Sequence, residues 1–171
     1  MSAITRISLV LGGARSGKSA YAERLLTALP PPWFYCAAAQ ALDHEMRERI
    51  AHHRERRGPG WQTIEEPLGI APLIQSSTSP MLVDCLTLWL TNLMLARRDV
   101  ESESAGLLAA VRAARAPIVF VSNEAGLGIV PDNALAREFR DHAGRLNQAV
   151  AAIANRVVFM IAGLPMVLKD E

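Results

Sequence analysis

Eight residues near the N-terminus have the spacing of a phosphate-binding loop. Gly12–Ser19 reads GGARSGKS and fits the pattern G-x-x-x-x-G-K-[ST]. Glycines let the backbone curl so that its N–H groups face a phosphate, and a helix that follows presents its positive end to the same anion. In such a loop Lys18 reaches the β- and γ-phosphates and the Ser19 hydroxyl binds Mg²⁺. A glycine-rich turn that carries GKS by chance is the alternative, and the apolar run before the loop and the helical pattern after it argue against that.

A carboxylate closes the third apolar run of the chain. Met81–Cys85 reads MLVDC, so Asp84 stands at the end of an expected strand. An acid in this position completes the Mg²⁺ site of a phosphate-binding loop, directly or through water. The alternative is an Asp that caps the next helix. Because the loop itself requires a carboxylate nearby, we favour the metal role.

A basic segment carries two adjacent histidines. Over Leu42–Arg57 the apolar residues step by four and lead to His53, which leaves His52 off the buried face. Residues 47–57 hold five arginines and two glutamates, a local net charge of +3 without histidine. This charge suits a polyphosphate, and an imidazole can attack phosphorus as a nucleophile. From these residues alone, however, a solvated helix face is the simpler interpretation.

Elements that alternate along the chain must position these residues. Continuous apolar runs indicate strands buried on both faces, and the segments between them have helical periodicity. The expected strands are Ile7–Leu11, Trp33–Ala37, Met81–Cys85, Ile118–Ser122 and Val157–Ala162. The expected helices are Lys18–Leu29, Leu42–Arg57, Leu86–Arg97, Ser102–Arg115 and Asn133–Asn155. This alternation predicts an α/β fold with a mostly parallel sheet flanked by helices.

The expected strand ends bring the candidate residues to one edge of the sheet. Gly12–Ser19, Ala37–Gln40, Asp84 and Asn123–Gly128 all follow carboxyl ends of strands, where open α/β sheets bind ligands. In the last helix, which Asp132 can cap, one apolar stripe should face the core and the polar residues should lie away from it. The stripe is Leu135, Phe139, Ala143, Leu146, Val150 and Ile153; the polar set is Arg137, Arg140, Asp141, Arg145, Asn147 and Gln148.

The composition is that of a globular enzyme rather than a binder of polyanions. The chain has 171 residues, 50% of them hydrophobic, with a net charge of +1 that argues against nucleic acid as a partner. Cys36 and Cys85 sit in apolar runs and are expected to be reduced core residues. No apolar run approaches the length of a membrane helix, and no targeting signal is apparent. We expect one cytoplasmic domain that spans residues 1–171.

Three segments together resemble the bifunctional adenosylcobinamide kinase/adenosylcobinamide-phosphate guanylyltransferase of cobalamin biosynthesis. They are GGARSGKS, AQALDHEMRERIAHHRERR and VSNEAGLGIVPDNALAREFRDHAGRLNQ, in this order. The resemblance implies a RecA-type P-loop fold, assembled as a homotrimer. It also implies two reactions: phosphorylation of adenosylcobinamide with ATP or GTP, then transfer of GMP from GTP to that phosphate, with release of pyrophosphate and formation of adenosylcobinamide-GDP.

The resemblance also implies roles for individual residues. His52 is the histidine that becomes guanylylated, which reverses the preference for a merely solvated helix, and Lys18 is the second catalytic residue. Ser19 and Asp84 are the metal ligands. The nucleotide-binding positions are Gly12, Gly13, Ala14, Arg15, Ser16, Gly17, Lys18, Ser19, Ala37, Ala38, Ala39, His53, Arg54, Glu55, Arg56, Glu65 and Asp84.

The chain departs from its relatives at two places. Relatives often carry hydroxyl residues within the stretch that is Ala37–Ala39 here, and often Glu in place of Asp84. The first difference removes possible side-chain hydrogen bonds to the nucleotide, and the second shortens a ligand by one methylene. Two other functions are weighed against the bifunctional enzyme: a small-molecule P-loop kinase in which His52 is only a surface residue, and a nucleotide-dependent switch protein.

Overall fold

Seven strands lie side by side in the computed structural model, which describes residues 6–39 and 57–171. They are β1 Ile7–Gly12, β2 Trp33–Ala37, β3 Trp61–Glu65, β4 Met81–Asp84, β5 Ile118–Asn123, β6 Arg156–Ile161 and β7 Leu164–Asp170. Their order in the sheet is β3-β2-β4-β5-β1-β6-β7. All neighbours are parallel except β6 and β7, which pair antiparallel. The sheet is therefore mostly parallel, as the alternation predicted.

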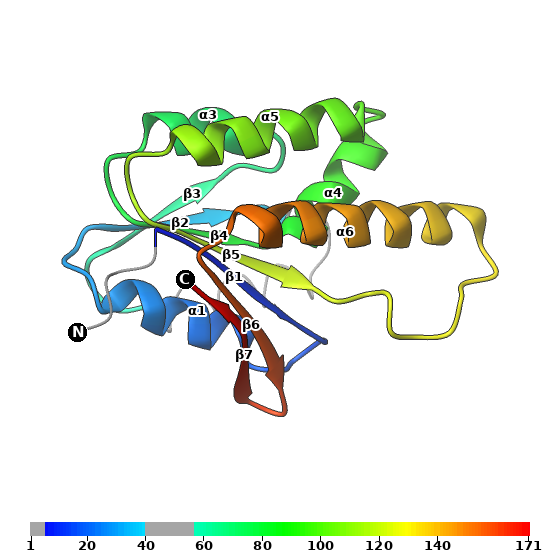
Figure 1. The fold of residues 1–171 in the computed structure, drawn as a ribbon. Helices are drawn as coiled ribbons and strands as arrows, with labels where there is room; N and C mark the ends of the chain where they lie inside the picture. Colours follow the sequence, from blue (N-terminus) through cyan, green and yellow to red (C-terminus); the bar gives the residue numbers. More distant parts are fainter. Residues whose placement is uncertain (1–5, 40–56) are drawn as a thin grey trace.

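Helices cover both faces of this sheet. They are α1 Lys18–Thr27, α3 Ile70–Ser76, α4 Leu86–Leu95, α5 Val100–Ala113 and α6 Ala134–Ile153. Figure 1 shows α1 on one face and α3, α4, α5 and α6 on the opposite face. The result is the expected arrangement of a sheet between helical layers. Within the described residues, no helix is both long and apolar enough to cross a membrane.

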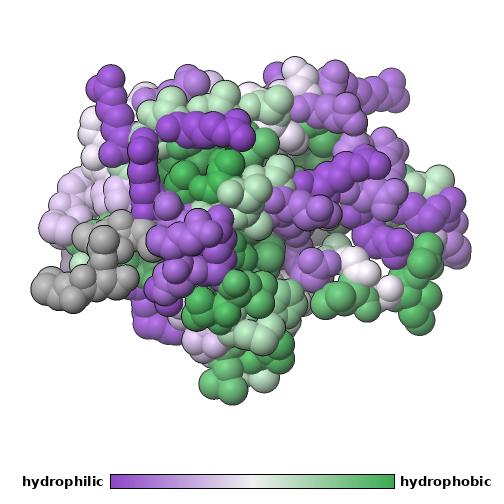
Figure 2. Space-filling view, in the orientation of Figure 1, coloured by the Kyte–Doolittle hydropathy of each residue, from purple (hydrophilic) through white to green (hydrophobic). Residues whose placement is uncertain are grey.

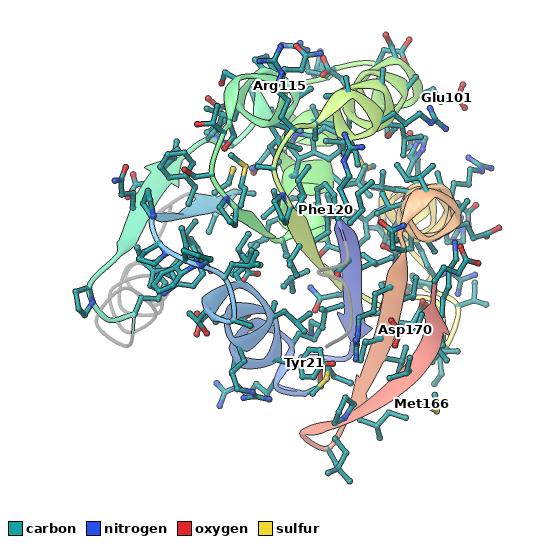
Figure 3. All side chains as sticks on the ribbon, turned by 60° about the vertical axis from the view of Figure 1, so that its left-hand side comes forward. Tyr21, Glu101, Arg115, Phe120, Met166 and Asp170 are labelled. Carbon is teal, nitrogen blue, oxygen red and sulfur yellow. The ribbon has the colours of Figure 1, made fainter. Side chains whose placement is uncertain are left out.

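Two apolar clusters hold the layers together, one on each face of the sheet. Leu9 and Phe120 point into the cluster beneath the four helices, where Figure 3 marks Phe120. Val10 and Leu82 point into the cluster beneath α1. Because successive residues of a strand face opposite sides, strands buried on both sides must be apolar throughout. This is why the central strands could be found as continuous apolar runs.

Three elements were missed by the sequence reasoning. β3 begins at Trp61, where neither a strand nor a helix was expected, and it is half exposed at the edge of the sheet, so its residues are not continuously apolar. The short helix α3 buries only Ile70 and Ile74. The edge strand β7 is largely exposed and follows a two-residue turn in which Ala162 and Gly163 both have positive φ.

The last helix differs from its expected pattern in its cap and in two of its residues. Asn133, not Asp132, caps α6, because its side-chain oxygen accepts a hydrogen bond from the Ala136 N–H at 3.2 Å. Leu135 was placed in the buried stripe, yet it is 57% exposed because the first turn of α6 extends beyond the sheet. Asn147 was placed among the solvated residues, yet it is buried.

Buried hydrogen bonds explain the position of Asn147. The Ser122 hydroxyl donates to Asn147 Oδ1 at 2.7 Å, and Asn147 Nδ2 donates to the Asn123 carbonyl at 3.2 Å. A polar side chain with such partners can be buried without an unpaired group. α6 is thereby tied to the carboxyl end of β5.

Candidate active site

The phosphate-binding loop lies at the carboxyl end of β1, where the motif predicted it. β1 ends at Gly12, and α1 begins at Lys18. Between them the backbone turns through left-handed conformations at Arg15 and Gly17, with φ of 54° and 94°. A chain that curls in this way brings successive N–H groups to one side and forms a concave site for an anion. The amino end of α1 adds its positive dipole at the same place.

Gly12 is packed so closely that no other residue fits there. A Cβ at this position would lie 2.6 Å from the Met160 carbonyl oxygen, and φ is +152°. We therefore predict that Gly12→Ala destabilises the fold by about 2–4 kcal/mol. At the next residue, Gly13, a Cβ would meet nothing within 4 Å.

Gly13→Ala is thus the matched control, and we expect it to change the free energy of unfolding by no more than about 0.5 kcal/mol. Urea unfolding of both variants measures the difference. Equal stability of the two variants would show that β6 does not approach Gly12 closely enough to exclude a side chain.

Lys18 lies folded back over the loop. Its side-chain ammonium donates to the Gly13 carbonyl and, at 3.5 Å, to the Ser16 hydroxyl. The residue is only 7% exposed. A buried ammonium over a ring of backbone N–H groups makes this loop suited to a highly charged anion.

The turn between β6 and β7 supports the loop from outside. The Gly163 N–H donates to the Ser16 carbonyl at 3.1 Å. Gly17 also approaches this turn, because a Cβ on it would lie 3.4 Å from the Gly163 Cα. The missed strand β7 therefore helps to fix the shape of the phosphate-binding loop.

Three of the predicted residues stand at one level of the sheet. Ala37 of β2 is in register with Glu65 of β3 on one side and with Asp84 of β4 on the other. Ala37 belongs to the cluster beneath α1, and residues in register on neighbouring strands point to the same face. Glu65 and Asp84 therefore point to the face that carries α1, the helix that begins at the phosphate-binding loop.

Asp84 does not cap the helix that follows it. The cap position of α4 is Cys85, and no side chain makes a capping hydrogen bond there. Instead the Asp84 carboxylate oxygen Oδ2 accepts a hydrogen bond from the Tyr35 hydroxyl at 2.8 Å. The capping alternative is thus wrong, and the carboxylate is held on the face of the sheet that carries α1.

One strand separates Asp84 from the loop strand. β5 lies between β4 and β1, with Val121 in register with both Asp84 and Val10. Two strand spacings put the Asp84 Cα about 10 Å from the Cα of Val10. A ligand that reaches from the loop to Asp84 must therefore cross the end of β5.

The end of β5 carries a polar cluster of which sequence reasoning found only Asn123, in the candidate segment Asn123–Gly128. Asn123 is in register with Gly12, and its Nδ2 donates to the Thr87 hydroxyl at 2.8 Å. The Thr87 hydroxyl also lies 3.1 Å from the Cys85 sulfur. The available signal was positional, since Asn123 and Thr87 both stand at or just after the carboxyl ends of buried strands.

The turn after β2 has less backbone to offer a ligand than expected. The Ala38 N–H already donates to the Asp84 carbonyl at 3.2 Å, and the Ala38 carbonyl accepts from Asn92 Nδ2 at 2.8 Å. Ala38 is fully buried, whereas Ala39 is partly exposed. The Ala38 side chain is therefore packed, and within this turn Ala39 is the residue that a nucleotide could meet.

Both cysteines are core residues, as predicted. Burial raises the pKa of the Cys36 thiol to about 12 and also raises the pKa of Cys85. Thiols with raised pKa values stay protonated at neutral pH and are poor nucleophiles. The chemistry of this edge therefore rests on oxygen and nitrogen groups.

The donor set fits a metal that arrives with a nucleotide. Among the described residues, no group of three or more His, Cys, Asp or Glu side chains could hold a metal ion alone. Ser19 and Asp84 offer one hydroxyl and one carboxylate, which are hard oxygen ligands. Mg²⁺ is commonly bound by one or two protein oxygens together with substrate phosphates. The two side chains therefore suit Mg²⁺ bound to a triphosphate.

Part of the predicted site lies outside the described residues. This part consists of His52, His53, Arg54, Glu55 and Arg56, together with the expected helix over Leu42–Arg57 except its last residue. Arg57 is described, and its guanidinium carbon lies 3.5 Å from the centre of the Tyr35 ring.

Comparison with protein families gives a match over nearly the whole chain. Residues 8–168 match the family described as cobinamide kinase / cobinamide phosphate guanyltransferase. The bifunctional adenosylcobalamin biosynthesis protein CobP of Pseudomonas aeruginosa is 49% identical over 168 residues, which cover 95% of this chain and 97% of that protein. The corresponding CobU protein of Salmonella typhimurium is 40% identical over 179 residues, covering 94% and 98%.

Solved structures resemble the chain in fold at low sequence identity. One solved ATPase domain is 11% identical with a TM-score of 0.55, over 98% of this chain and 78% of that one. A KaiC-like protein of Pyrococcus horikoshii is 12% identical with a TM-score of 0.56, over 97% and 80%. With the mostly parallel sheet flanked by helices, these likenesses show the RecA-like fold of P-loop nucleoside triphosphatases.

Proposed function

The chain belongs to the cobinamide kinase / cobinamide phosphate guanyltransferase family, and from this premise we propose that it carries out both reactions at the loop edge of its sheet. It is a transferase that phosphorylates adenosylcobinamide with ATP or GTP. It then transfers GMP from GTP to adenosylcobinamide phosphate, which gives adenosylcobinamide-GDP and pyrophosphate. The observation that carries this proposal is the family match over residues 8–168, which contain the phosphate-binding loop at the end of β1.

In the first reaction the loop Gly12–Ser19 binds the triphosphate. The backbone N–H groups hold the phosphate oxygens, and the Lys18 ammonium exchanges the Gly13 carbonyl for oxygens of the β- and γ-phosphates. The substrate hydroxyl attacks the γ-phosphorus and gives up its proton to water, and the bond to the bridging oxygen breaks to release the nucleoside diphosphate. Lys18 offsets negative charge that builds up on these oxygens, and this is the main source of catalysis in phosphoryl transfer.

Ser19 and Asp84 would hold Mg²⁺ with the nucleotide. When bound, the ion neutralises phosphate charge and orients the phosphates for in-line attack. Glu65 stands at the same level of the sheet as Asp84 and adds negative charge on the face of the sheet that carries α1. Ala39, His53, Arg54, Glu55 and Arg56 are proposed to contact the nucleotide.

In the second reaction His52 is the nucleophile. A nitrogen of its neutral imidazole attacks the α-phosphorus of GTP, and the bond between this phosphorus and the bridging oxygen breaks to release pyrophosphate. An oxygen of adenosylcobinamide phosphate then displaces the histidine from the guanylyl group. A protonated imidazole has no lone pair to attack with, so this step needs the neutral ring.

Product analysis tests the proposal. Purified protein is incubated with adenosylcobinamide, Mg²⁺ and either ATP alone or GTP alone. We expect adenosylcobinamide phosphate with ATP, and adenosylcobinamide-GDP with pyrophosphate when GTP is present. Phosphorylation without any GMP transfer would leave a small-molecule kinase, and slow hydrolysis of the triphosphate without any corrinoid product would indicate a switch protein.

We also propose that the chain forms a homotrimer, as its resemblance to the family implies. Figure 2 shows apolar surface at the tip of the β6–β7 hairpin and along the loop before α6. Leu127 and Ile129 in that loop are 82% and 97% exposed. Exposed apolar patches of this kind mark contact surfaces between proteins.

Light scattering coupled to size exclusion should therefore give three times the 18.6 kDa mass of one chain. A monomer at micromolar concentration would contradict the trimer.

The cytoplasmic location of the protein stays a prediction.

A further inference from the structure

Tyr35 is buried directly beside the proposed metal ligand. It lies on β2, which pairs directly with β4, the strand of Asp84. Its hydroxyl donates to Asp84 Oδ2 at 2.8 Å. Only 6% of the residue is exposed. This hydrogen bond is made to Oδ2, so the Tyr35 hydroxyl leaves the other carboxylate oxygen, Oδ1, to a different partner. The two oxygens of Asp84 are therefore in different environments.

We propose that Tyr35 is a positioning residue that holds one oxygen of Asp84 so that the other is presented to Mg²⁺. A carboxylate on a short side chain can rotate about its last bond, and a rotating ligand binds a metal less tightly than a fixed one. A hydrogen bond to Oδ2 restrains that rotation and leaves Oδ1 to bind the ion. This inference rests on the proposed function, because it assigns a partner to the metal ligand of that same site.

Tyr35 is well suited to donate this hydrogen bond continuously. The phenol of a tyrosine carries its proton at neutral pH, so the Tyr35 hydroxyl is available as the donor to Asp84. A neutral donor to a charged acceptor makes a strong hydrogen bond without adding charge near the phosphates.

The ring of Tyr35 is held in place from two sides. The Arg57 guanidinium stacks on it, with 3.5 Å between the guanidinium carbon and the ring centre. The Trp61 ring meets it edge-on, with 6.2 Å between ring centres. A buried ring with a cation on its face and an aromatic ring at its edge keeps its hydroxyl in one position.

α1 packs over the face of the sheet that carries Tyr35, because Ala22 and Leu26 of this helix share an apolar cluster with Tyr35. Residues three apart on a helix lie on one side of it, so Ser19 is on the side of α1 that carries Ala22. The second proposed metal ligand is therefore on the helix face that is turned toward the sheet.

Tyr35→Phe separates this role from simple packing, because it keeps the ring and removes only the hydroxyl. The probe is Mn²⁺ with a GTP analogue that cannot be hydrolysed, and free Mn²⁺ is measured by electron paramagnetic resonance. We expect the dissociation constant for Mn²⁺ in the ternary complex to rise about tenfold. Binding of the analogue in EDTA should stay within about twofold of the wild type, since the loop is unchanged.

Tyr21→Phe is the matched control. Tyr21 stands on α1 toward β6, where Arg156 Nη2 donates to its hydroxyl at 3.5 Å (Figure 3). Its loss should leave the Mn²⁺ dissociation constant unchanged. In a double-mutant cycle, Tyr35→Phe should cause no further loss of Mn²⁺ affinity when Asp84→Asn is already present.

The outcomes separate this inference from the proposed function. A wild-type protein that binds no Mn²⁺ with the analogue would overturn the proposed function and this inference with it. A wild type that binds the metal, with Tyr35→Phe at the same affinity, would overturn only the role of Tyr35. An equal loss of affinity from Tyr35→Phe in the presence and absence of Asp84→Asn would also overturn it, because the hydroxyl would then act elsewhere.

Discussion

Replacing Lys18 with alanine is expected to slow phosphoryl transfer to adenosylcobinamide by about a thousandfold. The ammonium is buried over the loop, where charge on the phosphate oxygens is poorly screened by water. Without it, the charge that builds up on the transferring phosphoryl group loses a cation that the loop holds in place. The rate is measured with ATP labelled at the γ-phosphate, by counting label in the corrinoid product.

The only other lysine of the chain offers a matched control. Lys169 lies on the edge strand β7, where its ammonium pairs with Glu171 at 3.3 Å. Lys169→Ala should transfer phosphate at the wild-type rate, and circular dichroism should show that both variants are folded. Transfer by folded Lys18→Ala at the wild-type rate would refute the role given to the phosphate-binding loop.

Replacing His52 with asparagine is expected to abolish GMP transfer while leaving the first reaction within about threefold of the wild type. Asparagine keeps polarity at this position but has no nitrogen that can attack the α-phosphorus, so the covalent route is lost. Phosphorylation of adenosylcobinamide does not use this imidazole. The two products, measured in one reaction with GTP, therefore separate the two steps.

His142→Asn is the control for loss of a histidine elsewhere. His142 lies on α6, where its ring faces Glu138 one helical turn away. We expect this variant to form adenosylcobinamide-GDP normally. Formation of that product by His52→Asn at the wild-type rate would show that another group carries the guanylyl moiety, or that none does.

The central part of the fold could be predicted because burial on both faces leaves a clear pattern. β1, β4 and β5 lie inside the sheet, and their residues are apolar almost without interruption. β3 and β7 form the two edges, where one side or both meet solvent and the apolar pattern weakens. The glycine in the turn before β7 was the remaining signal, since two residues with positive φ favour a hairpin.

The site could be predicted as far as its chemistry is local in sequence. The loop Gly12–Ser19 is a contiguous motif, and Asp84 stands at a strand end, so both could be found without the structure. The register that brings Glu65 level with Asp84 depends on strand pairing, which single-sequence patterns do not contain. Tyr35 escaped notice for a related reason: in sequence, an aromatic residue within a buried strand is indistinguishable from a packing residue.

The covalent intermediate provides the most direct test of the account. The protein is incubated with Mg²⁺ and GTP labelled at the α-phosphate, then denatured, and the label bound to protein is counted. We predict a bound guanylyl group that is labile in acid, stable in alkali, lost in His52→Asn and released by adenosylcobinamide phosphate. Absence of bound label, under conditions in which the protein binds GTP, would contradict the two-step transfer on which the proposed function depends.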